Sequence, residues 1–317
     1  MSEALFATTA LATVPRVLGF CDRDPDSPTF GCCDRAYWHY RLTDVANSRA
    51  QEAGLLFSLA WRYQDEGNLF AGQDSVLEWV RGIWRFWLAA RNRDGSTREI
   101  YPNERSFCAT SFSAAAFVES VRLLDAADRY QEELKLAEST FLWLGDHENP
   151  DVANQMAASL HALAGYATLT GDARIARLAA KRGEAVAALQ NAQGTFGEYG
   201  GLDVGYQSIT LSSLTAISRL IPEMPWVGEA LRHGLEAIEP RIGEDGHVDW
   251  RGNSRRTQYV YPRALAANAS PALERLSQGL AKGTLLNPCW LDDRYTTAFA
   301  ADYLFTAMEI GHAHDHP

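Results

Sequence analysis

Turns spaced about fifty residues apart are the feature of this sequence that most constrains its fold. Residues 92–95, 191–194 and 243–246 form similar turns, and a further turn passes through Gly145. Their marker glycines at positions 95, 145, 194 and 246 are 50, 49 and 52 residues apart. A constant period of this length accommodates one helical hairpin with its loops, and it indicates a repeat architecture.

Two segments in each period carry apolar residues at positions i, i+3, i+4 and i+7, which predicts paired helices. The expected helices cover roughly residues 46–63 with 73–91, 107–126 with 129–144, 151–169 with 173–190, 207–220 with 225–238, 257–267 with 270–282, and 295–310. Pro262 is expected to break the first helix of the fifth pair. No convincing alternating strand is found apart from short possibilities such as residues 247–250.

The two helices of each pair differ in character. The first is rich in small and apolar residues around most of its circumference, whereas the second carries a charged face, as at Arg174, Arg177 and Lys181. Helices that are apolar nearly all round are buried on both sides. We therefore predict an all-α fold, an (α/α)6-like toroid or barrel with six inner helices inside a ring of outer ones. An open helical solenoid is the alternative.

The predicted toroid forms a single domain over residues 1–317, with an irregular segment at 1–45 packing on the barrel rim and a flexible tail at 311–317. The net charge of −11 argues against a nucleic-acid partner. No stretch approaches the roughly 18 consecutive apolar residues of a membrane span. The first fifteen residues carry no Lys or Arg, so no secretory signal is expected and a cytoplasmic location is predicted.

The five cysteines include no CxxC pair, and no HExxH motif occurs. Neither a metal site nor a cofactor is therefore predicted. The oligomeric state remains open at this level.

Unusual polar residues concentrate in the loops that precede the inner helices. In a toroid these helices run parallel, so their N-terminal ends open at one rim. The glycine-rich segment 194–208 contributes Glu198, Asp203, Tyr206 and Gln207. The other loops contribute Tyr37, Trp38 and His39; Asn103 and Arg105; Asn154; Trp250, Arg255, Arg256 and Tyr259; and Asp293 and Arg294. Aromatic rings beside amides and charged groups are typical of a sugar site. Each residue alone could be a helix cap or a core aromatic, but together they predict a ligand site.

Two short segments resemble the α/α-toroid polysaccharide lyases, the heparinase II/III-like and alginate-lyase-like enzymes. Residues 101–106, Tyr-Pro-Asn-Glu-Arg-Ser, are similar to the Asn-containing segment that opens an inner helix in those enzymes. Residues 205–211, Gly-Tyr-Gln-Ser-Ile-Thr-Leu, are similar to their catalytic Tyr segment. Histidines that the family carries near the Asn, and often after the Tyr, are replaced here by Glu104-Arg105 and Gln207. The resemblance implies a toroid that acts on an acidic polysaccharide by β-elimination.

The chemistry can also be stated from the residues alone. Removing the proton next to a uronate carboxylate requires that carboxylate to be neutralised, for which Asn103 and Arg105 are candidates. Tyr206 is the candidate base, provided that the helix N-terminus and a neighbouring Arg lower its pKa. The predicted substrate is a uronate-containing or acidic oligosaccharide or polysaccharide. The same groups would serve C5 epimerisation. The alternatives are a glycoside hydrolase that pairs carboxylates such as Glu198 and Asp203, and a non-catalytic carbohydrate-binding or scaffold protein.

Overall fold

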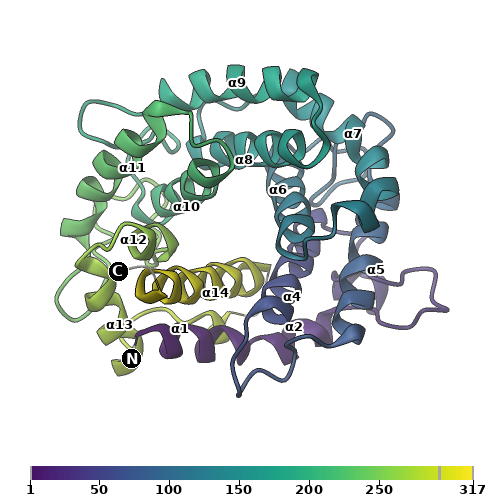
Figure 1. Ribbon diagram of the computed structural model, residues 1–317, viewed down its shortest axis with the longest axis horizontal. Helices are drawn as coiled ribbons and strands as arrows, with labels where there is room; N and C mark the ends of the chain where they lie inside the picture. Colours follow the sequence, from purple (N-terminus) through teal and green to yellow (C-terminus); the bar gives the residue numbers. More distant parts are fainter. Residues whose placement is uncertain (1, 292–293, 316–317) are drawn as a thin grey trace.

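A closed ring of six inner helices forms the centre of the molecule. The computed structural model describes residues 2–291 and 294–315. In chain order, the inner helices are α4 (Ala53–Arg62), α6 (Phe107–Leu123), α8 (Ala153–Thr170), α10 (Val204–Leu220), α12 (Arg263–Ala267) and α14 (Arg294–Asp315). Each packs against the next, and α14 packs against α4, so the ring closes (Figure 1). The predicted all-α toroid is thus confirmed, and the open solenoid is excluded.

A second layer of helices surrounds this ring. It consists of α5 (Asp74–Ala90), α7 (Gln131–Asp146), α9 (Ala173–Ala187), α11 (Pro225–Ile238), α13 (Ala272–Lys282) and α1 (Ser2–Leu11). The described part of the chain also contains four short 3-10 helices: Ser48–Glu52, Ala127–Tyr130, Glu239–Arg241 and Pro288–Trp290. Within the described ranges the chain forms isolated β-bridges, including one between Ile242 and Val248, but no strand. None of the described helices is both long and apolar enough to cross a membrane.

Residues 1–45 were expected to be irregular, but part of this segment is helical. Helices α1, α2 (Val14–Phe20) and α3 (Arg35–Trp38) lie there. Helix α1 buries Phe6 against Tyr303 of α14, with ring centroids 5.0 Å apart. The last inner helix needs an outer partner, and the N-terminus supplies it. Because this pairing joins the two ends of the chain, no local sequence pattern could predict it.

Two boundaries differ from the prediction for physical reasons. Pro262 caps the N-terminus of α12, which is only five residues long, because proline lacks the N–H that an earlier start would require. Helix α14 continues to Asp315, so residues 311–315 are helical where a flexible tail was predicted. Residues 316–317 lie outside the described part of the chain.

Glycines at the repeated turns make close contacts that a side chain would prevent. Gly95 and Gly194 have φ values of +92° and +77°, in the left-handed region. A Cβ at Gly95 would collide with the backbone of Ser139 in α7, and one at Gly194 with the backbone of His233 in α11. Each of these turns therefore packs tightly on the outer helix of the following pair. Gly145, predicted to mark an equivalent turn, instead lies inside α7.

Candidate functional site

A cavity of about 320 Å³ opens where the inner helices begin. Every inner helix contributes to its wall: Leu55, Phe112, Ala158, Ile209, Arg263 and Ala298 come from α4, α6, α8, α10, α12 and α14 in that order. The N-terminal ends of the inner helices therefore share one mouth. This is the geometry that places loop residues from distant parts of the sequence around a single ligand.

Four of the predicted site residues line this cavity. They are Asn154 at the start of α8, Tyr206 at the start of α10, Arg255 in the loop before α12, and Arg294 at the start of α14. The ring thus brings together one amide, one phenol and two guanidinium groups.

Asn103 and Arg105, predicted to neutralise a substrate carboxylate, do not line the cavity. Both side chains are exposed, and Arg105 pairs with Asp94, with 2.5 Å between Nε and Oδ2. Asn103 adopts a φ of +63° in a turn. These two residues shape their own loop, whereas Asn154 lines the cavity.

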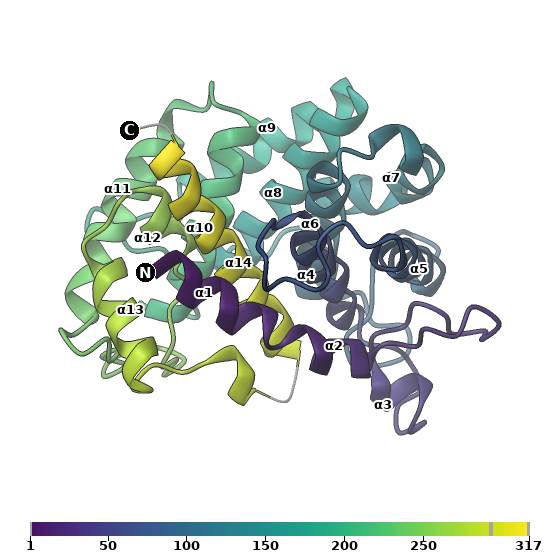
Figure 2. The same ribbon diagram turned by 60° about the horizontal axis from the view of Figure 1, so that its bottom comes forward.

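The predicted aromatic residues also lie outside the cavity wall. Trp38 belongs to α3 and donates its indole N–H to the Phe20 carbonyl oxygen at 2.7 Å. Figure 2 shows α3 at the lower edge of the molecule, away from the inner ring. Neighbouring Tyr37 and exposed His39 share this position, and neither touches the cavity. Tyr259 packs on Phe299 behind the wall, with ring centroids 5.6 Å apart.

Trp250 and exposed Arg256 do not line the cavity either. Arg256 has a φ of +56°, and it follows the lining residue Arg255 directly. Asp293 lies outside the described residues.

Asp203 and Gln207 do not line the cavity, but their hydrogen bonds position residues and loops around it. Asp203 caps α10 by accepting a hydrogen bond from the Tyr206 N–H at 3.1 Å, and its second oxygen accepts one from the Arg255 N–H at 3.0 Å. One buried carboxylate therefore positions two lining residues. Gln207 donates to the Gly234 carbonyl oxygen at 2.9 Å and accepts from the Phe196 N–H at 3.2 Å. It ties the glycine-rich loop to α11.

Glu198 lies behind Asn154 and is fully buried. Its carboxyl accepts hydrogen bonds from the backbone N–H of Asn154 at 2.7 Å and from the side-chain amide at 2.8 Å. Burial raises the pKa of Glu198 to about 8, although these hydrogen bonds oppose the shift. The carboxyl is therefore mostly protonated at neutral pH, and it holds the Asn154 amide against the cavity wall.

The free energy of unfolding should fall as the pH rises from about 4.5 to about 8, because Glu198 binds its proton more tightly in the folded state. At about 1.4 kcal/mol per pH unit, this residue alone accounts for at most about 5 kcal/mol. Urea denaturation near pH 5 and pH 8 measures the loss. Glu198→Gln cannot ionise and should flatten the slope, whereas the exposed control Glu184→Gln should not. An unchanged slope in Glu198→Gln would show that Glu198 is ionised throughout.

The pKa of Tyr206 is raised, whereas the role of a base predicted from the sequence required a lowered pKa. Burial raises the pKa of Tyr206, and the neighbouring Tyr295 raises it further. Arg255 acts in the opposite direction but is outweighed. A buried phenol loses more hydration on ionising than one helix end and one arginine restore. The hydroxyl of Tyr206 is therefore protonated at neutral pH.

The cavity carries a small positive excess in a strongly acidic chain. Four arginines and three carboxylates line it, which gives 4 − 3 = +1, whereas the whole chain carries −11. Arg49 pairs with Glu52, and Arg294 pairs with Glu99 at 2.8 Å. Arg255 lies over the Tyr199 ring, with its Cζ 4.5 Å from the centroid, and no described carboxylate pairs with it. Arg255 is thus available to an anionic ligand.

Several lining residues were not among the predicted site residues. Tyr199 lies in the same glycine-rich loop as Tyr206, and Tyr295 follows Arg294, so proximity in sequence was a usable signal. Arg49 gave no such signal, because it enters the site from a short 3-10 helix and packs over Phe112. His161 lies deep in the cavity wall, 3.4 Å from Glu119.

No group of three or more His, Cys, Asp or Glu residues within the described ranges is placed to hold a metal ion. The five cysteines are free thiols.

Comparison with known proteins shows a similar fold in a solved structure. No protein-family profile matches the chain, and no curated protein matches it. Among solved structures, the chain is similar to the chondroitin AC lyase of Streptomyces coelicolor A3, solved in complex with chondroitin sulphate. The TM-score is 0.60 at 15% sequence identity, over 99% of this chain and 46% of the lyase chain. The chain therefore spans about half the length of that enzyme. The predicted resemblance to toroid lyases is confirmed at the level of the fold.

Proposed function

We propose that this protein is a polysaccharide lyase that cleaves a uronate-containing chain by β-elimination. The observation that carries the proposal is the meeting of Tyr206, Asn154 and Arg255 at the N-terminal mouth of one α/α toroid. The structurally similar chondroitin AC lyase was solved with an acidic polysaccharide bound, which supports the substrate class.

The first requirement of the reaction is a neutralised uronate carboxylate. Arg255 has no competing carboxylate partner among the described residues, so its guanidinium can receive that group. The Asn154 amide, held by Glu198, lies in the same wall and can hydrogen-bond to the carboxylate as charge develops on it. Together these groups would make the proton on C5 of the sugar more acidic.

The second requirement is proton transfer. The reaction removes the C5 proton and breaks the bond between C4 and the glycosidic oxygen, leaving a C4–C5 double bond on one product and a new hydroxyl on the other. Tyr206 as a phenolate would accept the C5 proton and then donate it to the leaving oxygen, so no net proton is consumed. Arg255 favours the phenolate, and Tyr295 places a second phenol beside it.

Incubation with uronate-containing oligosaccharides tests this proposal directly. A lyase produces the ultraviolet absorbance of an unsaturated uronate together with new chain ends. New reducing ends without that absorbance would indicate a hydrolase. Solvent deuterium entering C5 without cleavage would indicate an epimerase, and binding without turnover a carbohydrate-binding protein. A hydrolase that pairs Glu198 with Asp203 has little structural support, because both carboxyls lie behind the cavity wall.

Arg255→Ala should lower kcat/KM by about 10- to 150-fold, because a hydrogen bond to a charged partner is worth about 1.5–3 kcal/mol. The adjacent Arg256→Ala is a matched control, since it removes the same charge from outside the cavity. Steady-state kinetics on an acidic oligosaccharide measure both variants. Equal losses in the two would indicate general electrostatic attraction and not a specific contact at Arg255.

A further inference from the structure

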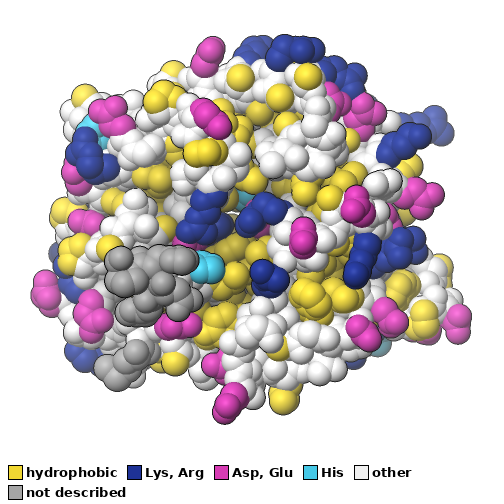
Figure 3. Space-filling view, viewed as in Figure 1, with side chains coloured by type: hydrophobic (Ala, Val, Ile, Leu, Met, Phe, Trp, Pro, Cys, Tyr) yellow, Lys and Arg dark blue, Asp and Glu magenta, His cyan; other side chains and the backbone are white. Residues whose placement is uncertain are grey.

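A second cavity, of about 180 Å³, opens at the opposite end of the ring. It lies where α4, α6, α10 and α14 approach their C-terminal ends, and its titratable lining consists of Arg62, Arg122, Arg219, Glu309 and His312. In Figure 3, which views the molecule down the ring, Lys and Arg side chains gather around the central hollow. We call this space the far cavity.

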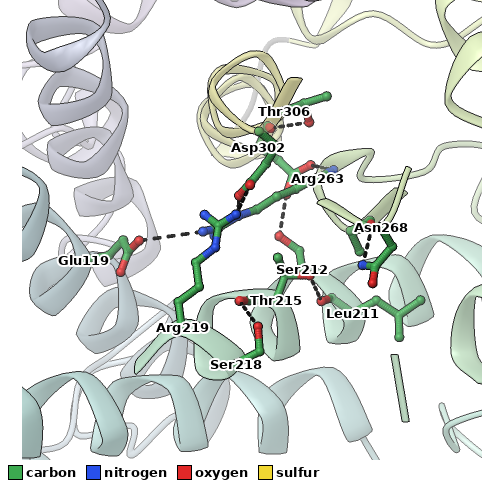
Figure 4. Close-up of polar contacts among 12 residues, drawn as sticks. Glu119, Leu211, Ser212, Thr215, Ser218, Arg219, Arg263, Asn268, Asp302 and Thr306 are labelled. Carbon is green, nitrogen blue, oxygen red and sulfur yellow. Dashed lines mark hydrogen bonds and ion pairs between the residues drawn. The ribbon is translucent and has the colours of Figure 1, made fainter. Parts of the chain in front are cut away.

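Positive charge exceeds negative charge around the far cavity. Arg122 pairs with Glu119, with 2.6 Å between Nη2 and Oε1, and Arg219 pairs with Glu309. The buried Arg263 lies between the two glutamates, with Nε 3.3 Å from Glu309 and Nη2 3.9 Å from Glu119. Figure 4 shows Glu119, Arg219 and Arg263 converging from α6, α10 and α12.

This network separates the far cavity from the first cavity. Arg263 and Asp302 line the first cavity, and Phe305 contributes to both. Asp302 accepts hydrogen bonds from the Ser212 hydroxyl at 2.5 Å and from the backbone N–H of Arg263 at 3.0 Å. Its carboxylate therefore lies on the side of the network that faces the first cavity. The far cavity is therefore a distinct space.

One of its arginines has no carboxylate to neutralise it. Arg62 ends α4, its side chain is exposed, and no described residue forms an ion pair with it. With Arg62 included, three arginines and one glutamate line the far cavity, which gives 3 − 1 = +2. Helix dipoles favour a cation at each C-terminal end. Ion pairs with Glu119 and Glu309 also hold Arg122 and Arg219 there, but no carboxylate among the described residues balances the charge that Arg62 adds.

We infer that the far cavity is a binding site for a small oxyanion, held by the guanidinium groups of Arg62, Arg122 and Arg219. The forked N–H donors of arginine match the geometry of sulfate, phosphate and carboxylate oxygens. A volume of 180 Å³ equals about six water molecules at roughly 30 Å³ each, which suits one oxyanion with part of its hydration shell. The anion would be either free in solution or an acidic substituent of a sugar.

Titration with sodium sulfate tests the inference, with sodium chloride added to keep the ionic strength constant. Calorimetry and the Tm should both show saturable binding to the wild-type protein. Arg62→Ala should weaken that binding at least tenfold, because it removes a charge-assisted contact. The matched control is Arg177→Ala, which removes an exposed, unpaired arginine from α9 and should bind sulfate like the wild type.

The matched pair is decisive because sulfate stabilises folded proteins in general by exclusion from their surfaces. A Tm rise that is the same in wild type and Arg62→Ala, or a calorimetric response without saturation in every protein, would overturn the inference. A sulfated monosaccharide distinguishes the two sources of the anion. Binding that depends on Arg62 indicates a sugar substituent, whereas Arg62-dependent binding of inorganic sulfate alone indicates a free anion.

Discussion

Tyr206→Phe is expected to lower kcat by about 10²- to 10⁴-fold, the usual contribution of a positioned general acid or base. The substitution keeps the ring at the start of α10 and removes only the hydroxyl, so the free energy of unfolding should change little. Tyr199→Phe is the matched control: it keeps a ring beneath Arg255 in the same cavity and should retain activity within a few-fold. Turnover by Tyr206→Phe at the wild-type rate would remove this residue from the mechanism.

The same residue predicts how the rate depends on pH. Because burial and Tyr295 raise the pKa of Tyr206, only a small fraction is phenolate at neutral pH. The value of kcat/KM should therefore rise about tenfold per pH unit on the neutral-to-alkaline side, as long as the protein stays folded. A rate that falls over this range would mean that Tyr206 acts only as an acid and that another group removes the C5 proton.

Glu119→Gln is expected to lower the free energy of unfolding by about 3–5 kcal/mol, because it removes one partner from a buried ionic network. Glu119 is 1% exposed and lies beside Arg122, His161 and Arg263. Burial alone would raise its pKa, but hydrogen bonds from His161 and Arg122 outweigh burial and hold the pKa of Glu119 well below its usual range. The charge is therefore needed at all ordinary pH values.

Urea denaturation measures the effect of Glu119→Gln, with the exposed Glu132→Gln on α7 as the control. The control should change the free energy of unfolding by less than about 0.5 kcal/mol, as surface substitutions usually do. A loss below about 1 kcal/mol in Glu119→Gln would contradict the prediction. It would mean that the surrounding cations are neutralised by other groups when the carboxylate is removed.

The fold was largely predictable because its signals are local. A helix of the inner layer is apolar nearly all round, whereas a helix of the outer layer has a charged face. Composition alone therefore distinguished α6 and α8 from α9. Pro262 marked the break before α12 for an equally local reason. Helix α1 was missed because its partner α14 lies at the other end of the chain, and only ring closure brings the two together.

The site was predictable only in part because neighbouring residues in a loop point in different directions. Arg255 lines the cavity, whereas Arg256, next to it, does not. Asn103 and Arg105 lie just before an inner helix, and Asn154 lies in the first turn of another. Arg105, however, forms an ion pair with Asp94 within its own loop. Residue type and position before a helix identified the rim, whereas contacts within each loop decided which side chains enter the cavity.

By itself, the sequence determined an all-helical, two-layer architecture with a period near fifty residues. These properties follow from side-chain periodicity and turn chemistry, which act over a few residues. Only the tertiary structure decided that Tyr206, Asn154 and Arg255 share one cavity, that Glu198 and Asp203 support it from behind, and that a cationic hollow lies at the other end. Those outcomes depend on packing between residues far apart in the chain, where burial and neighbouring charges set each group's role.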